Sequence, residues 1–313
     1  MSTVLKRFSL VGVAVALLAT GCGTGPAKAG SAAIVGGEAI KLQTVQDRTV
    51  TVLKKEPAAQ QWHEQGKLDQ VSRLVLTDEI THKIVEHAAK RENITVDENK
   101  VYDSIREAGG AEAASKQSEQ DPSTIHRFTR DILTMGELAR RNLSTLQITV
   151  DFLFVKDLKE AKEKAQQVAA DSSKMKEFIE SAPRNTSGAA QSGSNQKVRV
   201  TENPTLATTP LWAAKPGTVI AFQLDEQAAT SMVALVKERN TVPAVPGEDD
   251  LAERVDPKLL ADFGKRIAQY LAADLAIELN PRYGVWDPIL PSVKPSVGEL
   301  SGFMAAAATK NKS

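Results

Sequence analysis

The sequence contains few cysteine, histidine and aromatic residues, and neither sign of charge is in excess. Among 313 residues there are one cysteine and four histidines, and 4% are Phe, Trp or Tyr. A single cysteine excludes a disulfide framework and a thiolate metal site within the chain. The 39 basic residues are matched by 39 acidic ones, so the basic footprint expected of a nucleic-acid-binding protein is missing. The core must be built from Leu, Ile, Val and Ala, and this composition favours helices.

The histidines do not form a metal-binding pattern. His82, Glu86 and His87 come nearest, but zinc-binding helices place their two histidines four residues apart. Here they are five apart, which turns them about 140° from each other around a helix, so we interpret this stretch as a solvated helix face. His63 and His126 have no readable partners. No nucleophile elbow, phosphate loop or dinucleotide fingerprint occurs, so the sequence predicts neither a metal nor an organic cofactor.

Long apolar runs are also missing, apart from one near the start of the chain. Residues 8–19 carry no charge and follow Lys6 and Arg7. At about 12 residues, the run is shorter than the roughly 20 needed to cross a bilayer as a helix. The basic start, the apolar middle and the small residues before Cys22 predict a secretory signal peptide over residues 1–21.

Cys22 closes the stretch Leu18-Ala19-Thr20-Gly21-Cys22. This stretch resembles a bacterial lipobox, in which the cysteine thiol receives a diacylglycerol and becomes the first residue of the mature protein. The resemblance implies that Cys22 is lipidated, that residues 22–31 are a flexible tether, and that the protein is anchored on the outer face of the cell membrane. The alternative is an ordinary signal peptide followed by an unmodified cysteine, although a lone thiol is unusual in an exported protein.

Residues 32–146 have mainly helical periodicity. Between about 68 and 92, apolar residues recur every four positions and predict one long helix that ends at Asn93. Asp97 is the expected N-cap of the next helix. Asp121-Pro122 predicts the start of another helix, with aspartate as the cap and proline in the first turn.

The period changes at Ile148, where apolar residues begin to alternate with a spacing of two, as in a strand. Asp157 then caps a helix, and residues 185–196 are expected to form a flexible loop. The pattern over residues 148–238 as a whole predicts the element order β-α-α-β-α-β-β, which would form a compact sheet covered by helices. Trp212, Trp286 and Tyr283 fit either core anchors or a peptide-binding surface, and the scarcity of aromatic residues favours the core.

Residues 250–280 predict the longest helix, because eight apolar residues from Leu251 to Leu279 mostly fall four apart. Such a stripe must be buried, and the N-terminal helices are its expected partner. We therefore expect an α+β protein in which residues 32–146 and 250–280 form one helical domain and residues 148–238 are inserted into it. Residues 281–313 are expected to be a tail, disordered towards its end.

The order of these helices and strands is similar to that in the SurA and PrsA families of exported bacterial chaperones and foldases, and three stretches carry the similarity. Residues 32–40 resemble the start of the SurA N-terminal domain, residues 88–105 its helix–turn–helix, and residues 211–219 the parvulin signature with Lys-Pro-Gly-x-Val. Residues 280–287 also resemble the ending of SurA-like lipoproteins. The resemblance implies a helical SurA N-terminal-like domain completed by the C-terminal helix, with an inserted parvulin-like domain.

Parvulins are peptidyl-prolyl isomerases whose pattern places one histidine in the first strand and another in the last. Here Phe152 aligns with the first histidine and Met232 falls near the second, and residues 148–238 contain no histidine. The resemblance therefore implies a parvulin-like fold without its active site, rather than an enzyme.

The expected function is that of a chaperone that holds unfolded or partly folded exported polypeptides in an apolar cleft between the two domains. A prolyl isomerase with a rearranged pocket is one alternative. A structural or adaptor lipoprotein with one dedicated partner is another. No pattern in the sequence fixes the oligomeric state.

Overall fold

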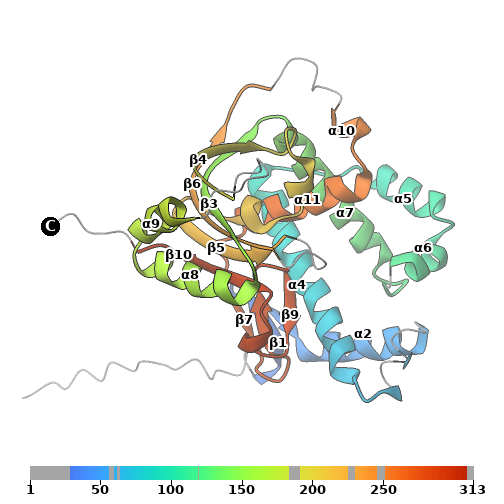
Figure 1. The fold of residues 1–313 in the computed structure, drawn as a ribbon. Helices are drawn as coiled ribbons and strands as arrows, with labels where there is room; N and C mark the ends of the chain where they lie inside the picture. The colour runs from blue at the N-terminus through green and yellow to red at the C-terminus, as the bar shows by residue number, and fades with distance from the viewer. Residues whose placement is uncertain are drawn as a thin grey trace, which may run out of the picture.

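The computed structural model describes residues 29–55, 60–61, 64–118, 120–182, 191–224, 230–244 and 251–308. Its architecture is α+β, as predicted from the sequence, with a set of helices packed beside an antiparallel sheet (Figure 1). The C-terminal end of the described chain contributes to both parts, through helix α11 and strand β10 (Gly302–Ala306). The N-terminal strands β1 (Ser31–Val35) and β2 (Glu38–Lys41), by contrast, form a separate three-stranded sheet with β7 (Ile277–Leu279). The helical part contains α2 (Leu42–Lys55), α4 (Leu68–Glu92), α5 (Glu98–Glu107), α6 (Ala111–Ser118), α7 (Ile125–Leu143), α10 (Leu251–Arg254) and α11 (Pro257–Leu271).

Local signals define several of these helices. Helix α4 occupies the predicted range and ends at Asn93, whose φ of 51° is left-handed, a conformation that asparagine tolerates. The Asp97 side chain accepts a hydrogen bond from the backbone N–H of Asn99, as expected of an N-cap. The start predicted at Asp121-Pro122 is wrong, because Asp121 instead accepts from the N–H of Ser123 in a turn and α7 begins at Ile125.

The single helix predicted over 250–280 is also wrong. The helix breaks after α10, because the Asp256 carboxylate accepts from the N–H groups of Lys258 and Leu259 and Pro257 takes the first position of α11. This is the arrangement expected of a new helix start. Helix α11 ends at Leu271, and residues 277–279 form strand β7, which pairs with β1 (Ser31–Val35).

Helix α11 packs against α7 and α4. It comes very close to α7 at Gly264, where a Cβ atom would lie 1.8 Å from the carbonyl oxygen of Met135. The helices therefore touch backbone to backbone at this point, and only glycine fits. Leu260, Phe263 and Ile267 on α11 are buried in the contact.

The main sheet has the antiparallel strand order β10-β5-β6-β3-β4. Two helices, α8 (Leu158–Ala170) and α9 (Ser173–Ser181), lie at one side of the sheet (Figure 1). Asp157 caps α8, since its side chain accepts from the N–H of Glu160, as the sequence predicts. The strands are β3 (Leu146–Val155), β4 (Ser192–Arg199), β5 (Thr218–Gln223), β6 (Ser231–Thr241) and β10 (Gly302–Ala306).

Two sequence predictions for this region need correction. The tail expected from residue 281 instead forms β8 (Val285–Asp287), β9 (Ser292–Lys294), the short helix η3 (Val297–Glu299) and β10, which adds an edge strand to the sheet beside β5. Residues 192–196, expected in a flexible loop, belong to β4 and pair with β3. Two single-turn helices, η1 (Pro204–Leu206) and η2 (Pro210–Ala213), precede β5, and β2 (Glu38–Lys41) pairs with β1.

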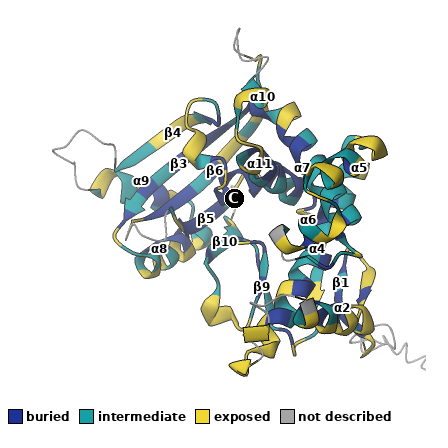
Figure 2. Cartoon of the chain, turned by 90° about the vertical axis from the view of Figure 1, so that its right-hand side faces the viewer, coloured by how far each residue is buried: buried dark blue, intermediate teal, exposed yellow. Residues whose placement is uncertain are grey.

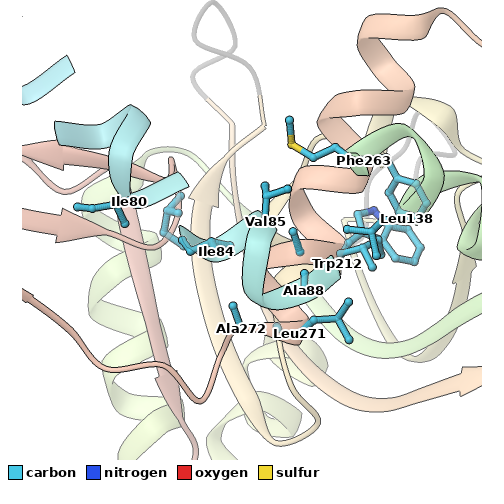
Figure 3. Close-up of a cluster of buried hydrophobic side chains, with 14 of the residues drawn as sticks. Ile80, Ile84, Val85, Ala88, Leu138, Trp212, Phe263, Leu271 and Ala272 are labelled. Carbon is cyan, nitrogen blue, oxygen red and sulfur yellow. The ribbon is translucent and has the colours of Figure 1, made fainter. Parts of the chain in front are cut away.

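The sheet and the helical part share one hydrophobic core (Figure 3). Trp212 of η2 is fully buried, and its ring meets that of Phe263 edge to face, with the centroids 5.5 Å apart. Its indole Nε1 donates to the carbonyl oxygen of Leu206 at 2.7 Å. Figure 2 shows buried residues running along β5, β6 and α11. The two parts are therefore joined by packing and not merely by a linker.

Candidate functional site

The two positions that the sequence aligns with the parvulin histidines lie on neighbouring strands of the main sheet. Phe152 of β3 lies opposite Ala234 of β6, and Met232 of β6 lies opposite Phe154 of β3. The rings of Phe152 and Phe154 have their centroids 5.3 Å apart. These side chains belong to the core shared with the helical part. None of these four side chains can donate or accept a proton.

An apolar pocket of about 590 Å³ opens between the helical part and the edge of the sheet. Its walls come mainly from the C-terminal end of α11, β7, β8 and β10, and α4 adds a wall from a distant part of the sequence. Trp286, Val285 and Met304 contribute half-buried side chains. The lining residues are Ile84, Ala213, Gln269, Ala272, Ala273, Leu275, Ile277, Leu279, Gly284, Val285, Trp286, Pro288 and Met304.

Among the described residues that line the pocket, none has a charged side chain. The side chain of Gln269 is engaged elsewhere, because its amide donates to the carbonyl oxygen of Pro288 and its oxygen accepts from Arg266. Gly284, with φ of 116°, lies so close to Lys294 that a Cβ atom would be 1.9 Å from the Lys294 carbonyl oxygen. That contact brings β8 against β9 and sets Trp286 beside the pocket. The site can therefore bury apolar groups.

Two edge strands, one from each of two sheets, border this pocket. β10 has a strand neighbour on one side only among the described residues, and so does β7. Met304 on β10 and Ile277 on β7 both line the pocket. An edge of this kind accepts an extended segment through backbone hydrogen bonds, which do not depend on the side chains of the segment.

The sequence did not predict this pocket, because its strands are short. Strand β7 falls within the range predicted as one long helix, and β8 and β10 fall within the predicted tail. Leu279 continues the four-residue spacing of Leu271 and Leu275, although Ile277 and Leu279 also alternate with Glu278 as in a strand. The turn residues Asn280-Pro281 and the glycine at 284 were the available signals of a break.

The histidine positions diverge, as expected from their spacing. His82 of α4 faces α7, where its Nδ1 lies 2.8 Å from the Asp131 carboxylate, whereas the Nε2 of His87 lies 3.9 Å from Asp274. His126 contacts Glu98, and His63 lies outside the described residues. Over the described ranges, no group of three or more histidine, cysteine or acidic side chains is placed to hold a metal ion.

A buried charge cluster links α2, α4 and α7. Both guanidinium Nη atoms of Arg127 donate to the Glu79 carboxylate, at 2.9 and 3.0 Å, and Arg48 adds another ion pair to it. Burial raises the pKa of Glu79, but the hydrogen bonds and charges of Arg127 and Arg48 outweigh it and hold the pKa below its ordinary value of 4.5. The Nε of Arg48 is buried without a hydrogen-bond partner, but the ion pairs of the cluster still fix the three helices relative to one another.

Replacing Glu79 with glutamine is expected to lower the free energy of unfolding by about 3 kcal/mol at pH 7, because it leaves buried arginines short of a partner. Since the folded-state pKa of Glu79 is depressed, its contribution is present above about pH 4.5 and is lost as the pH falls through the folded-state pKa. Urea unfolding of both proteins between pH 7 and pH 3 measures this. The exposed Glu137→Gln control removes a helix-surface pair with Arg141 and should change stability by less than about 0.5 kcal/mol. A difference for Glu79→Gln that grows at acid pH would contradict the account.

Cys22 and residues 1–21 lie outside the described residues. In the part of the chain that the structure covers, no helix combines the length and apolar composition required to span a bilayer.

Comparison with known proteins gives little further information. No protein-family model and no curated protein sequence matches the chain. Among solved structures, it is similar to a peptidylprolyl isomerase, PrsA, from Bacillus anthracis. The two chains are 14% identical, the match covers 63% of this chain and 94% of that one, and the TM-score is 0.23.

Proposed function

We propose that this protein is a chaperone that holds apolar segments of unfolded or partly folded exported polypeptides. The observation that carries the proposal is the apolar pocket between the helical part and the sheet, with its half-buried Trp286, Val285 and Met304 and its uncharged lining. A pocket of this kind selects for hydrophobicity and not for a particular sequence. The adjoining edge of β10 supports the same function, because it offers backbone hydrogen bonds to any extended segment.

The expected affinity is modest, as a chaperone that must release its clients requires. Full burial of one leucine-sized side chain contributes about 1.5–3 kcal/mol. Two such side chains in the pocket would therefore only partly offset the loss of translational, rotational and chain entropy on binding, about 4–15 kcal/mol. Binding of one segment is weak, and several exposed segments of one client would be needed for a stable complex.

Holding, rather than prolyl isomerisation, fits the residues at the parvulin positions. Twisting a peptide bond has a barrier of about 18–20 kcal/mol, and Phe152 and Met232 supply no polar group to lower it. A proline-limited refolding assay separates the two activities. A holdase delays refolding of the client, whereas an isomerase accelerates its slow phase. Crosslinking in cells separates a holdase, which gives many products, from an adaptor, which gives one dominant product.

The first test is suppression of client aggregation by the mature protein at stoichiometric ratio. The Met304→Glu variant places a charge in the pocket wall and is expected to reduce suppression at least tenfold, because apolar client groups would have to approach an unpaired carboxylate. Ala306→Glu is the matched control, since it adds the same charge at an exposed position on the same strand. Equal loss in both variants, or none in either, would count against the pocket.

We also propose that a lipid on Cys22 anchors the protein on the outer face of the cell membrane, which the lipobox-like stretch before it supports. A Cys22→Ser variant is expected to move the protein from the membrane fraction to the soluble fraction of fractionated cells. Its retention in the membrane fraction would refute lipidation at this position.

A further inference from the structure

Arg266 of α11 is a buried cation, and no carboxylate of the described residues is bonded to it. Its side chain is buried, with 7% exposure of the residue. Its Nε donates to the carbonyl oxygen of Thr208 at 2.7 Å, and its Nη1 donates to the carbonyl oxygen of Ile289 at 2.7 Å and to Gln269 at 3.0 Å. The third nitrogen, Nη2, donates to no group among the described residues. A guanidinium carries five N–H donors, so part of this one is available to a ligand.

Arg266 lines a second pocket, of about 300 Å³. Thr208 and Ser301 add hydroxyl groups to its wall, and Phe222, Leu224 and Leu290 add apolar surface. None of its lining residues belongs to the apolar pocket between the helical part and the sheet, which we call the client pocket after its proposed function. It therefore joins one cationic point to an apolar wall, a combination suited to an amphipathic anion.

The electrostatics favour an anion at this point. Burial lowers the pKa of Arg266 to about 10, although the negative charges of Asp262 and Asp287 oppose the shift. Asp287 does not neutralise the guanidinium, because its carboxylate is itself fully buried and accepts from the backbone N–H groups of Ile289, Leu290 and Ser301. A buried charge without a bonded counter-ion is costly, and a carboxylate is the partner that a guanidinium fits best.

We propose that this pocket binds a carboxylate attached to an apolar group. The carboxylate would take the free donor of Arg266 and the nearby hydroxyl groups, and the apolar group would rest on Phe222 and Leu224. Two sources have this chemistry: the carboxyl terminus of a polypeptide that ends in an apolar residue, and a free alkyl carboxylic acid. The inference is independent of the proposed chaperone function, because it concerns a different pocket.

Isothermal titration calorimetry of the mature protein tests the proposal with three probes. These are hexanoate, an Ala-Ala-Leu tripeptide with a free carboxyl terminus, and the same tripeptide with its carboxyl terminus amidated. At least one of the two acids is expected to bind at least tenfold more tightly than the amide. Binding of the peptide acid alone identifies the polypeptide source, and binding of hexanoate alone identifies the free acid. An amide that binds as tightly as the acids, or acids that do not bind at millimolar concentration, would overturn the proposal.

Three variants complete the test. Arg266→Gln is expected to weaken acid binding at least tenfold. Leu290→Glu, at an exposed position of the pocket rim, should do the same by repelling the acid while it leaves the bonds of Arg266 in place. Arg239→Gln is the matched control, because Arg239 is another arginine whose pKa burial lowers to about 10, but it stacks on Tyr270 outside this pocket. Acid binding that survives Leu290→Glu unchanged would contradict the assignment even if Arg266→Gln fails to fold.

Discussion

Replacing Trp212 with alanine is expected to lower the free energy of unfolding by about 3–5 kcal/mol. The indole is fully buried, packs edge to face on Phe263 of α11 and donates a hydrogen bond to Leu206. Its loss would leave a cavity at the point where the sheet meets the helices, and it would leave the Leu206 carbonyl without that donor. Urea unfolding followed by far-UV circular dichroism measures the effect as a lower midpoint at an unchanged slope.

The matched control is Trp286→Ala, which removes the same side chain from a half-buried position in the client pocket. It is expected to be much less destabilising and to weaken client holding instead. The pair of variants thus separates a residue that joins the two parts from one that binds. If Trp212→Ala unfolded only the sheet, in a separate early transition, the shared core would not be what unites the molecule.

Replacing Gly264 with alanine is the second large expected effect, a loss of about 3 kcal/mol or more. A single methyl group at this position would lie 1.8 Å from the Met135 carbonyl oxygen, and backbone atoms cannot move aside as a flexible side chain does. Helices α7 and α11 would have to separate, which disrupts the packing of Phe263 and its neighbours. Thermal or urea unfolding of the purified variant measures the loss.

Gly136→Ala provides the control for this substitution on the facing helix. There the new methyl group would meet the end of the Arg140 side chain at 3.6 Å, an ordinary contact. The higher helix propensity of alanine is expected to stabilise this variant by up to about 1 kcal/mol. The same chemical change is therefore expected to have opposite signs at two positions, and equal effects at both would refute the close helix crossing.

Local patterns predicted the elements whose signals are contained in a few neighbouring residues. The four-residue period and Asn93 gave the bounds of α4, and Asp97 and Asp157 gave two helix starts. The dipeptide Asp-Pro shows how such signals fail, because it starts α11 at Asp256-Pro257 but only forms a turn at Asp121-Pro122.

Elements that depend on distant pairing were not predictable in this way. Strands β7 and β10 are short, and each is stabilised by a partner far away in the chain: β7 pairs with β1, and β10 pairs with β5. Leu279 of β7 continues the helical spacing of the residues before it, so tertiary pairing overrode a local preference. The client pocket combines Ile84, Leu275 and Met304, and no local pattern brings these residues together.

Site-specific photocrosslinking to an unfolded client tests the central proposal most directly. A benzophenone side chain replaces Met304 in the pocket in one protein, and in another it replaces Tyr102, an exposed aromatic residue of α5 (58% exposed) that does not line the pocket. Figure 1 places α5 at the far edge of the helical part from β7 and β10. The account predicts strong client crosslinks from position 304 and few from position 102. Crosslinks of equal strength at both positions, or from position 102 alone, would contradict it.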